Sequence, residues 1–390
     1  MEFFKRSFME LEGWKDTEKC LLQGLSPICA AGLSGVHKAQ LIYTMFNGNP
    51  LLVITDSEAA AKKLCDDINT MAGSRELAMP FPSRELYFTD AEGVSREYEH
   101  KRLEALSLLL EGKCGILAAS MEAMLEPVIP PDILKNSTVE IASGSVLNTE
   151  ELKKRLVESG YSRSDKVEGP SQFAVRGAIF DIFPVQSVLP VRIELWGDEI
   201  DSISYFDPET QRRTGQIDAI KIAPAIENIA DRLLLAEKIE ALSKGVRGKR
   251  RDIIRERLGR DVEKLKENAQ LTSIDKYIPL IYDKKSSLFD YFSGVTVFSE
   301  YNGALERAKG AYSQYEEDCR ILLEEGELCR GLDGHYFEPE DILCRAQKHP
   351  LLFLNTFIQG LDRVGYKKII SFEALQNAPW GGEMRQLNEE

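Results

Sequence analysis

The sequence lacks any run of the roughly 18 apolar residues that a membrane-spanning helix needs, and its first residues, MEFFKRSFMELEGWKD, are too interrupted by charges for a signal peptide. It is also poor in metal-ligand patterns: there are four His and seven Cys, with no CxxC pair and no metal spacing. An odd number of scattered thiols excludes a disulfide framework and is typical of the reducing cytoplasm. We therefore expect a cytoplasmic protein without a metal site.

Positive charge is scarce as well. Lys and Arg number 49 against 63 Asp and Glu, which gives a net charge of −14. Because DNA affinity comes largely from Lys and Arg that release phosphate counterions, this balance predicts weak or no direct DNA binding. The local exception is the basic run 244–257, in which Asp252 and Glu256 are interleaved. We interpret it as a solvated helix and its preceding loop, with a contact to nucleic acid or to another domain as the alternative.

What is present is an ordinary composition in a chain long enough for two or three domains. Strand and helix patterns alternate over residues 1–129, which predicts a parallel sheet with helices on both faces. The pair Pro130-Pro131 indicates a border, after which 130–213 has the pattern of a small α+β domain. Residues 214–390 carry a charged helical stretch over about 230–270 and further strands, which would complete the first sheet. The expected fold class is α/β.

The small domain has the most regular pattern in the chain. In VRIELW, Val191, Ile193 and Leu195 alternate with residues that would face water, so this strand has one buried and one wet face. Gly197-Asp198 provides a turn into a return strand. Upstream, Asn148 is expected to cap a helix that Gly160 ends. These elements predict a helix laid on a small sheet.

Three segments of this domain, FAVRGAIFDIFP, VRIELWGDEIDSI and FDPETQR, resemble the second domain of UvrB and of the amino-terminal module of the transcription-repair coupling factor (Mfd) family. In those families the domain docks UvrA, the damage-recognition protein of nucleotide excision repair, so the resemblance implies a binding role rather than catalysis. It also implies that the small domain is inserted into a split domain of the P-loop NTPase type.

The resemblance implies particular contact residues for UvrA. Arg163 and Arg176 lie where the docking arginines of the family align, and a planar guanidinium grips a carboxylate with two hydrogen bonds. Phe173 is expected to be an aromatic anchor, whereas Phe183 is expected to pack inside the domain. The residues alone favour a solvated surface arginine beside a tight Arg-Gly turn for Arg176, and only the resemblance favours a contact role.

A second site is expected to be degenerate. Gly32, Gly35 and Lys38 lie in the segment GLSGVHKA, which stands where a phosphate-binding loop would precede a helix. His37 replaces the second glycine of that motif and Ala39 replaces its magnesium-binding hydroxyl. The strand VTVF, which would supply the magnesium-organising Asp, ends in Ser299-Glu300. We therefore expect no cofactor, no metal and no ATPase activity, with a residual anion site near Lys38 as the alternative.

No other segment predicts catalysis. His100 and His335 have carboxylates nearby in sequence but no nucleophile or oxyanion donor, and we expect both to be solvent-exposed. Full chains of the resembling family also bind RNA polymerase and carry an ATP- and magnesium-dependent DNA translocase motor. No intact helicase motif occurs in these 390 residues, so we expect either a fragment or a shortened homologue. The aromatic hairpin of UvrB is also absent from LYFTDAEGVSREYEHKRLEAL. Two rival functions are a divergent nucleotide hydrolase that uses Lys38 and a DNA-binding module that uses 244–257.

Overall fold

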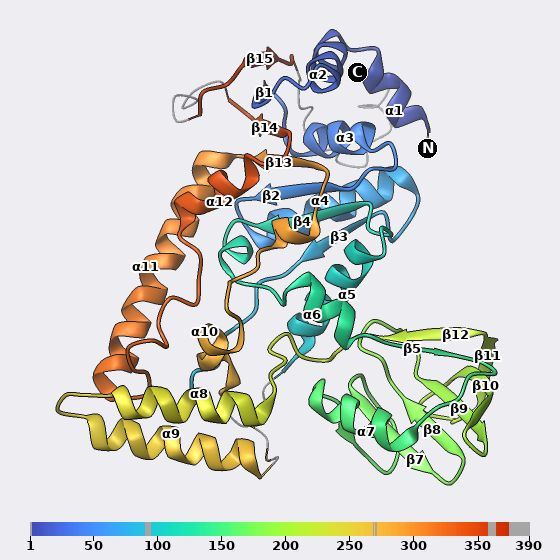
Figure 1. Ribbon diagram of the computed structural model, residues 1–390. Coiled ribbons are helices and arrows are strands. Elements are labelled where there is room, and N and C mark those ends of the chain that lie inside the picture. The colour runs from blue at the N-terminus through green and yellow to red at the C-terminus, as the bar shows by residue number, and fades with distance from the viewer. Residues whose placement is uncertain (1, 90–94, 268, 270, 358–363, 374–390) are drawn as a thin grey trace, which may run out of the picture.

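The computed structural model describes residues 2–89, 95–267, 269, 271–357 and 364–373. Its main sheet has seven parallel strands in the order β15-β1-β14-β13-β2-β4-β3 (Figure 1). The strands are β1 (Ile28–Ala31), β2 (Leu51–Thr55), β3 (Ala78–Phe81), β4 (Ile116–Ser120), β13 (Val295–Ser299), β14 (Leu351–Asn355) and β15 (Lys368–Ser371). The α/β class is confirmed, and the last part of the chain completes the sheet that the first part begins.

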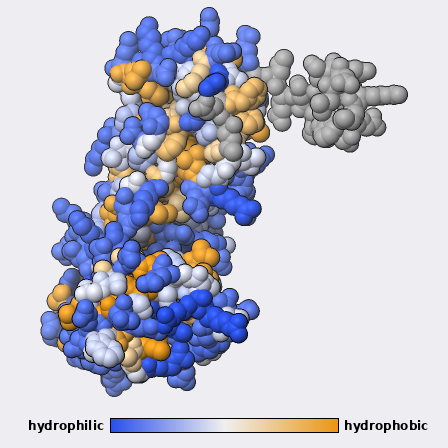
Figure 2. Space-filling view, turned by 90° about the vertical axis from the view of Figure 1, so that its right-hand side faces the viewer, coloured by the Kyte–Doolittle hydropathy of each residue, from blue (hydrophilic) through white to orange (hydrophobic). Residues whose placement is uncertain are grey.

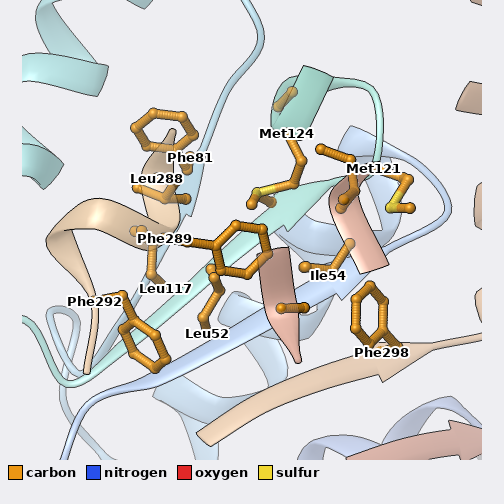
Figure 3. Packing of buried hydrophobic residues seen from close by; sticks show 14 of the residues in the cluster. Leu52, Ile54, Phe81, Leu117, Met121, Met124, Leu288, Phe289, Phe292 and Phe298 are labelled. Atoms are coloured by element: carbon orange, nitrogen blue, oxygen red, sulfur yellow. The ribbon is translucent and has the colours of Figure 1, made fainter. Parts of the chain in front are cut away.

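Helices cover both faces of this sheet, because its strands are apolar on both sides. Leu51 and Val53 of β2 pack toward the N-terminal helices, whereas Leu52 and Ile54 pack toward the opposite layer, where Phe289 lies over them (Figure 3). The first layer comprises α1 (Glu2–Met9), α2 (Glu12–Leu22), α3 (Gly35–Met45) and α4 (Glu58–Ala72). The second comprises α5 (Glu97–Leu110), η1 (Ala123–Leu125), α6 (Pro131–Ser137), η3 (Leu288–Tyr291), α11 (Tyr301–Glu325) and α12 (Pro339–Ala346).

A helical hairpin lies at the far end of α11 (Figure 1). It consists of α8 (Arg232–Gly245) and α9 (Arg251–Lys266), followed by η2 (Ile274–Tyr277) and α10 (Ile278–Ile281). The charged helical stretch predicted over about 230–270 is confirmed, as two helices joined by a loop. The chain turns between α8 and α9, where Gly248 has a φ of +109°, a conformation that side chains with a Cβ disfavour.

The small domain contains two sheets and one helix. The larger sheet has the order β11-β10-β9-β8-β7-β6, and the smaller pairs β12 with β5. Their bounds are β5 (Val139–Ala142), β6 (Ser162–Arg163), β7 (Gln172–Arg176), β8 (Ile179–Ile182), β9 (Val191–Trp196), β10 (Glu199–Phe206), β11 (Arg213–Ile217) and β12 (Ala219–Ile222). Helix α7 (Thr149–Glu158) begins at Asn148, whose side chain accepts from the N–H of Glu151 at 3.0 Å, so the predicted cap is confirmed.

The strand pairing shows which segments of the chain belong to the small domain. The border predicted between 213 and 214 falls within β11, which pairs with β10, and β12 pairs with β5, so both strands extend the small domain. After β4, Ser120 accepts from the N–H of Ala123 in the short turn η1, and the chain then extends to Pro130. Two further predictions lie partly outside the described residues. One is the third segment, 214–390, and the other is the absence of a UvrB-type hairpin from the stretch 86–106.

A buried ionic network ties these parts together. The guanidinium of Arg102 donates to Glu126 at 2.7 Å and to Glu227 at 2.6 Å, and that of Arg84 lies 3.1 Å from Glu99 and 3.4 Å from Asp275. Glu227 follows the small domain and Asp275 follows the helical hairpin, so the network joins segments far apart in sequence. Burial raises the pKa of Glu126 to about 7 despite its arginine neighbours. Within the described residues, no helix is both long and apolar enough to cross a membrane.

Candidate functional site

The small domain presents a charged sheet face on the side away from α7. Phe180, Ile182 and Ile193 point into the core under α7, so the residues that alternate with them lie on the opposite side. The strand register places Asp181 opposite Arg192 and Ile179 opposite Glu194. We call the surface formed by Arg176, Ile179, Arg192, Glu194 and Trp196 the polar face. Figure 2 views the molecule from the side that carries the small domain, and its lower part is mostly hydrophilic with separate apolar residues.

A buried carboxylate organises the polar face. Asp181 is fully buried, yet Arg176 donates to it at 2.6 Å, and Arg192 donates through Nε at 2.7 Å and Nη2 at 2.9 Å. Arg192 is held further by Gln211, to which it donates at 3.2 Å, and by the ring of Phe206, 4.5 Å from its guanidinium carbon. The hydrogen bonds from Arg192 to Asp181 raise the pKa of Arg192. Asp181 thus fixes two arginines in defined orientations.

One of these two arginines remains about half exposed to solvent. The side chain of Arg176 is 49% exposed, whereas that of Arg192 is 13% exposed. Beside them Glu194 pairs with Arg213 of β11 and accepts from Ser202 at 3.2 Å. Glu199, the register partner of Trp196, also lies on this side of the sheet, so three arginines there face three carboxylates and the surface carries charges of both signs.

Trp196 is the exposed aromatic residue of the polar face. It ends β9 two residues after Glu194 and is 83% exposed, at the turn that Gly197 makes with a φ of +65°. It was not among the predicted contact residues, although the alternation in VRIELW already placed it on the wet side. An exposed Trp next to oriented arginines is the composition that dominates interface energies.

Phe173 does not form part of this surface, and its prediction as a surface anchor was wrong. Its ring is 1% exposed and stacks on Phe180, with ring centroids 5.8 Å apart. The reason is that both faces of β7 are covered at this point, with Phe173 in the core under α7 and Ala174 in a separate cluster with Phe206. Phe183 belongs to that second cluster, which agrees with its predicted packing role.

The structure also separates Arg163 from Arg176. Arg163 is exposed on the edge strand β6, where its register partner is Phe173. Register partners point to the same side of a sheet, so Arg163 lies on the α7 side, near Glu150. Of the three predicted contact residues, only Arg176 lies on the polar face.

The loop predicted to be a degenerate phosphate loop is short. Gly32 has a φ of +91°, and a Cβ there would meet the carbonyl oxygen of Phe372 at 2.0 Å, so only glycine fits. Gly35 has open space around it and already begins α3. Consequently His37, whose Nδ1 lies 2.7 Å from the hydroxyl of Ser34, sits in a helical turn and not in an open loop.

Lys38 is closed off from solvent. It is 5% exposed, and its ammonium contacts the carboxylate of Glu300 and the hydroxyl of Thr356, the latter at 3.2 Å. The structure therefore brings together the two segments predicted as a failed nucleotide site, 32–39 and 295–300. Across the described ranges, no group of three or more His, Cys, Asp or Glu side chains could hold a metal ion.

Three arginines of the basic run bind backbone carbonyls at helix ends. Arg255 donates to the carbonyls of Ser243, Lys244 and Val246 at the end of α8, at 3.1–3.3 Å. Arg250 and Arg257 donate to the carbonyl of Glu325 at the end of α11. Cations at these positions satisfy the unpaired carbonyls and complement the helix dipole.

The predicted exposure of His335 was wrong. It is fully buried, with Nε2 3.2 Å from the carbonyl of Lys276 and Nδ1 3.1 Å from the hydroxyl of Tyr315. Burial lowers the pKa of His335 to about 4. It packs beside Phe88 as a neutral core residue.

In chain order, the small α+β unit with its charged sheet face lies between β4 and β13 of the helix-covered parallel sheet. Residues 139–227 match the family model described as UvrB interaction domain. This range ends at Glu227, after β12.

Matches to whole proteins agree. The transcription-repair-coupling factor of Bacillus subtilis (strain 168) is 29% identical over 399 residues, covering 99% of this chain and 34% of that protein. The Staphylococcus epidermidis protein of the same name is 26% identical, covering 94% and 31%, and that of Haemophilus influenzae is 28% identical, covering 74% and 25%. The chain spans about a third or less of the length of these relatives. It is related to an amino-terminal segment of transcription-repair coupling factors and contains a UvrB interaction domain.

Proposed function

We propose that the polar face of the small domain docks UvrA, and that the chain acts in this way in transcription-coupled nucleotide excision repair in the cytoplasm. The observation that carries the proposal is the buried Asp181, which holds Arg176 and Arg192 on the surface of a domain matched by the UvrB interaction model. Orienting two arginines before binding reduces the entropy that a complex would otherwise lose.

The chemistry of the face defines the partner surface that would fit it. Arg176 retains donors for a carboxylate of the partner, since one of its nitrogens alone is bonded to Asp181. Trp196, exposed at the hairpin tip, takes the part of aromatic anchor that Phe173 cannot fill. The complementary surface of UvrA then offers a carboxylate to Arg176 and an apolar pocket to Trp196.

Neither rival function is favoured by its own residues. As a degenerate phosphate loop, 32–39 has its lysine paired internally, and Ala39 provides no hydroxyl for magnesium, so the proposal includes no ATPase activity. Arg250, Arg255 and Arg257 of the run 244–257 donate to carbonyls at helix ends, and the net charge of −14 opposes DNA, so the proposal includes only weak or no direct DNA binding. RNA polymerase and DNA, which the resemblance assigns to other regions of longer relatives, are not proposed as partners of these 390 residues.

The test is co-elution of the 390-residue chain with UvrA in gel filtration, with Arg251→Gln as control. Arg251 is exposed on α9, away from the polar face, so its variant is expected to co-elute like the wild type. Arg176→Glu is expected to elute separately. Failure of the wild-type chain to co-elute, or co-elution of Arg176→Glu to the same extent, would contradict the proposal.

A further inference from the structure

The carboxyl edge of the main sheet contains a buried ammonium that is paired within the chain. Lys38 lies in the first turns of α3, and its side chain is 7% exposed. A buried charged group needs an opposite charge nearby, because its removal from water is otherwise strongly unfavourable. The anion present here belongs to the chain itself and is the carboxylate of Glu300.

The backbone conformation and hydrogen bonds of Glu300 hold it at this position. It follows β13 directly and precedes α11, with φ 53° and ψ 51°, a left-handed conformation that non-glycine residues rarely adopt. Its own N–H donates to the carbonyl of Leu354 at 2.9 Å. Its Oε1 atom accepts from the N–H of Thr356 at 2.8 Å and from the hydroxyl at 2.6 Å, in addition to Lys38.

The three groups join three neighbouring strands. Lys38 follows β1, Glu300 follows β13 and Thr356 follows β14, which lies between them in the sheet. The hydroxyl of Thr356 also lies 3.3 Å from the carbonyl of Leu33 in the loop after β1. Ligands of open parallel sheets bind at the carboxyl ends of the strands, which is where this contact lies. Burial raises the pKa of Glu300, but the hydrogen bonds from Lys38 and Thr356 outweigh it and lower that pKa overall.

We infer that Glu300 is a built-in anion, which occupies the place beside Lys38 that a phosphate group would take and so closes the carboxyl edge of the sheet from within the chain. The inference is separate from the docking of UvrA and extends only the proposal that 32–39 is a degenerate phosphate loop. Beyond the substitutions at His37 and Ala39, it gives a direct reason to expect no phosphate binding, namely an internal competitor. Removal of that carboxylate alone should therefore open an anion site.

Two variants of Glu300 separate charge from backbone strain. Glu300→Gly suits the positive φ and removes the side chain, whereas Glu300→Gln keeps the shape of the side chain and removes its charge. The probe is inorganic pyrophosphate, titrated calorimetrically at low salt into the 390-residue chain. We expect both variants to bind pyrophosphate at least about tenfold more tightly than the wild type, the size of one charge-assisted hydrogen bond.

The controls decide the origin of any binding. In Lys38→Met/Glu300→Gly the gain should disappear, because the ammonium that would hold the anion is gone. Binding of UvrA should be equal in all four proteins, which distinguishes failure of this inference from failure of the docking proposal. Equal affinity of the wild type and both Glu300 variants for pyrophosphate would overturn the inference. A gain in affinity that persists in Lys38→Met/Glu300→Gly would overturn it as well. If Glu300→Gly does not fold, comparison of Glu300→Gln with the wild type tests the same inference.

Discussion

The carboxyl edge of the main sheet and the polar face each set basic side chains against a carboxylate, and they use the pair in opposite ways. At the carboxyl edge of the main sheet, Lys38 is buried, and Glu300 and Thr356 contact it. On the polar face, Asp181 is buried but Arg176 is half exposed and keeps donors pointing to water. The first arrangement pairs its ammonium within the chain, whereas the second leaves donors of Arg176 for the partner that we propose.

The Arg84–Arg102 network is a larger case of the first kind. Its arginines are buried with carboxylates from three parts of the chain, so its charges serve folding. We therefore expect substitutions at the Lys38–Glu300 pair or in the Arg84–Arg102 network to alter stability. Substitutions on the polar face should alter binding.

The largest effect is expected at the closed network. Arg102→Met removes hydrogen bonds to two carboxylates and two backbone carbonyls, and it leaves Glu126 and Glu227 buried without their main counter-charge. We expect a loss of about 3–5 kcal/mol in the free energy of unfolding, as for other broken buried pairs, measured by urea denaturation. Arg251→Met on exposed α9 is the matched control. A loss below about 1 kcal/mol, the size of a surface pair, would break the comparison.

On the polar face, Trp196→Ala is expected to act on binding alone. A central aromatic anchor contributes about 2–4 kcal/mol to an interface, so the affinity for UvrA should fall at least about thirtyfold. The melting temperature should stay within about a degree, because the side chain is 83% exposed and packs on little. Calorimetry and a thermal melt of the same sample check both parts. An unchanged affinity would remove Trp196 from the face.

A pH effect should appear in the closed interior. The pKa of His335 is lowered to about 4, below its unfolded value of about 6.5, so the stability that neutral His335 contributes is present above pH 6.5 and is lost as the pH falls toward 4. Between about pH 7.5 and 5 this amounts to about 2 kcal/mol. The raised pKa of Glu126 works in the opposite direction, because the folded state takes up that proton as the pH falls through about 7.

Comparison with His335→Gln isolates the histidine contribution. Urea unfolding at both pH values should show a smaller loss of stability on acidification in the variant than in the wild type. Equal losses in the two proteins would mean that His335 does not remain neutral in the fold.

The smallest effect is expected from Arg176→Gln. Arg192 keeps both of its hydrogen bonds to Asp181, so the fold should lose less than about 1 kcal/mol. Binding to UvrA should weaken by about 1–2 kcal/mol, since one charge-assisted contact is lost. Arg176→Glu, by contrast, places a second carboxylate beside Asp181 and should also lower the melting temperature. A Gln variant that unfolds would place Arg176 among the residues that stabilise the fold.

The sequence was sufficient for features that depend on local pattern. Alternation in VRIELW and the Asn148 cap predicted the small sheet and its helix, and strand-helix alternation predicted the parallel sheet. Features that depend on tertiary contact were not predictable. Phe173 lies between polar and small neighbours, yet α7 covers its side of β7. The pairing of Lys38 with Glu300 joins residues 262 positions apart, and no local pattern encodes it.

Only part of the polar face could be predicted from the sequence. Arg176 was identified through the resemblance, but Asp181 was not, because a carboxylate within a strand shows its burial only when neighbouring strands are in place. The arginines of the basic run resembled a charged surface in sequence, and only the ends of α8 and α11 reveal their structural role.

Calorimetric titration of UvrA with the double variant Arg176→Gln/Trp196→Ala tests whether the polar face is the docking surface. Wild type and Arg251→Gln should bind alike, while the double variant should lose about 3 kcal/mol or more, roughly a hundredfold in Kd, with an unchanged melting temperature. Equal affinity of the double variant and the wild type would show that UvrA, if it binds this chain, binds somewhere other than the polar face.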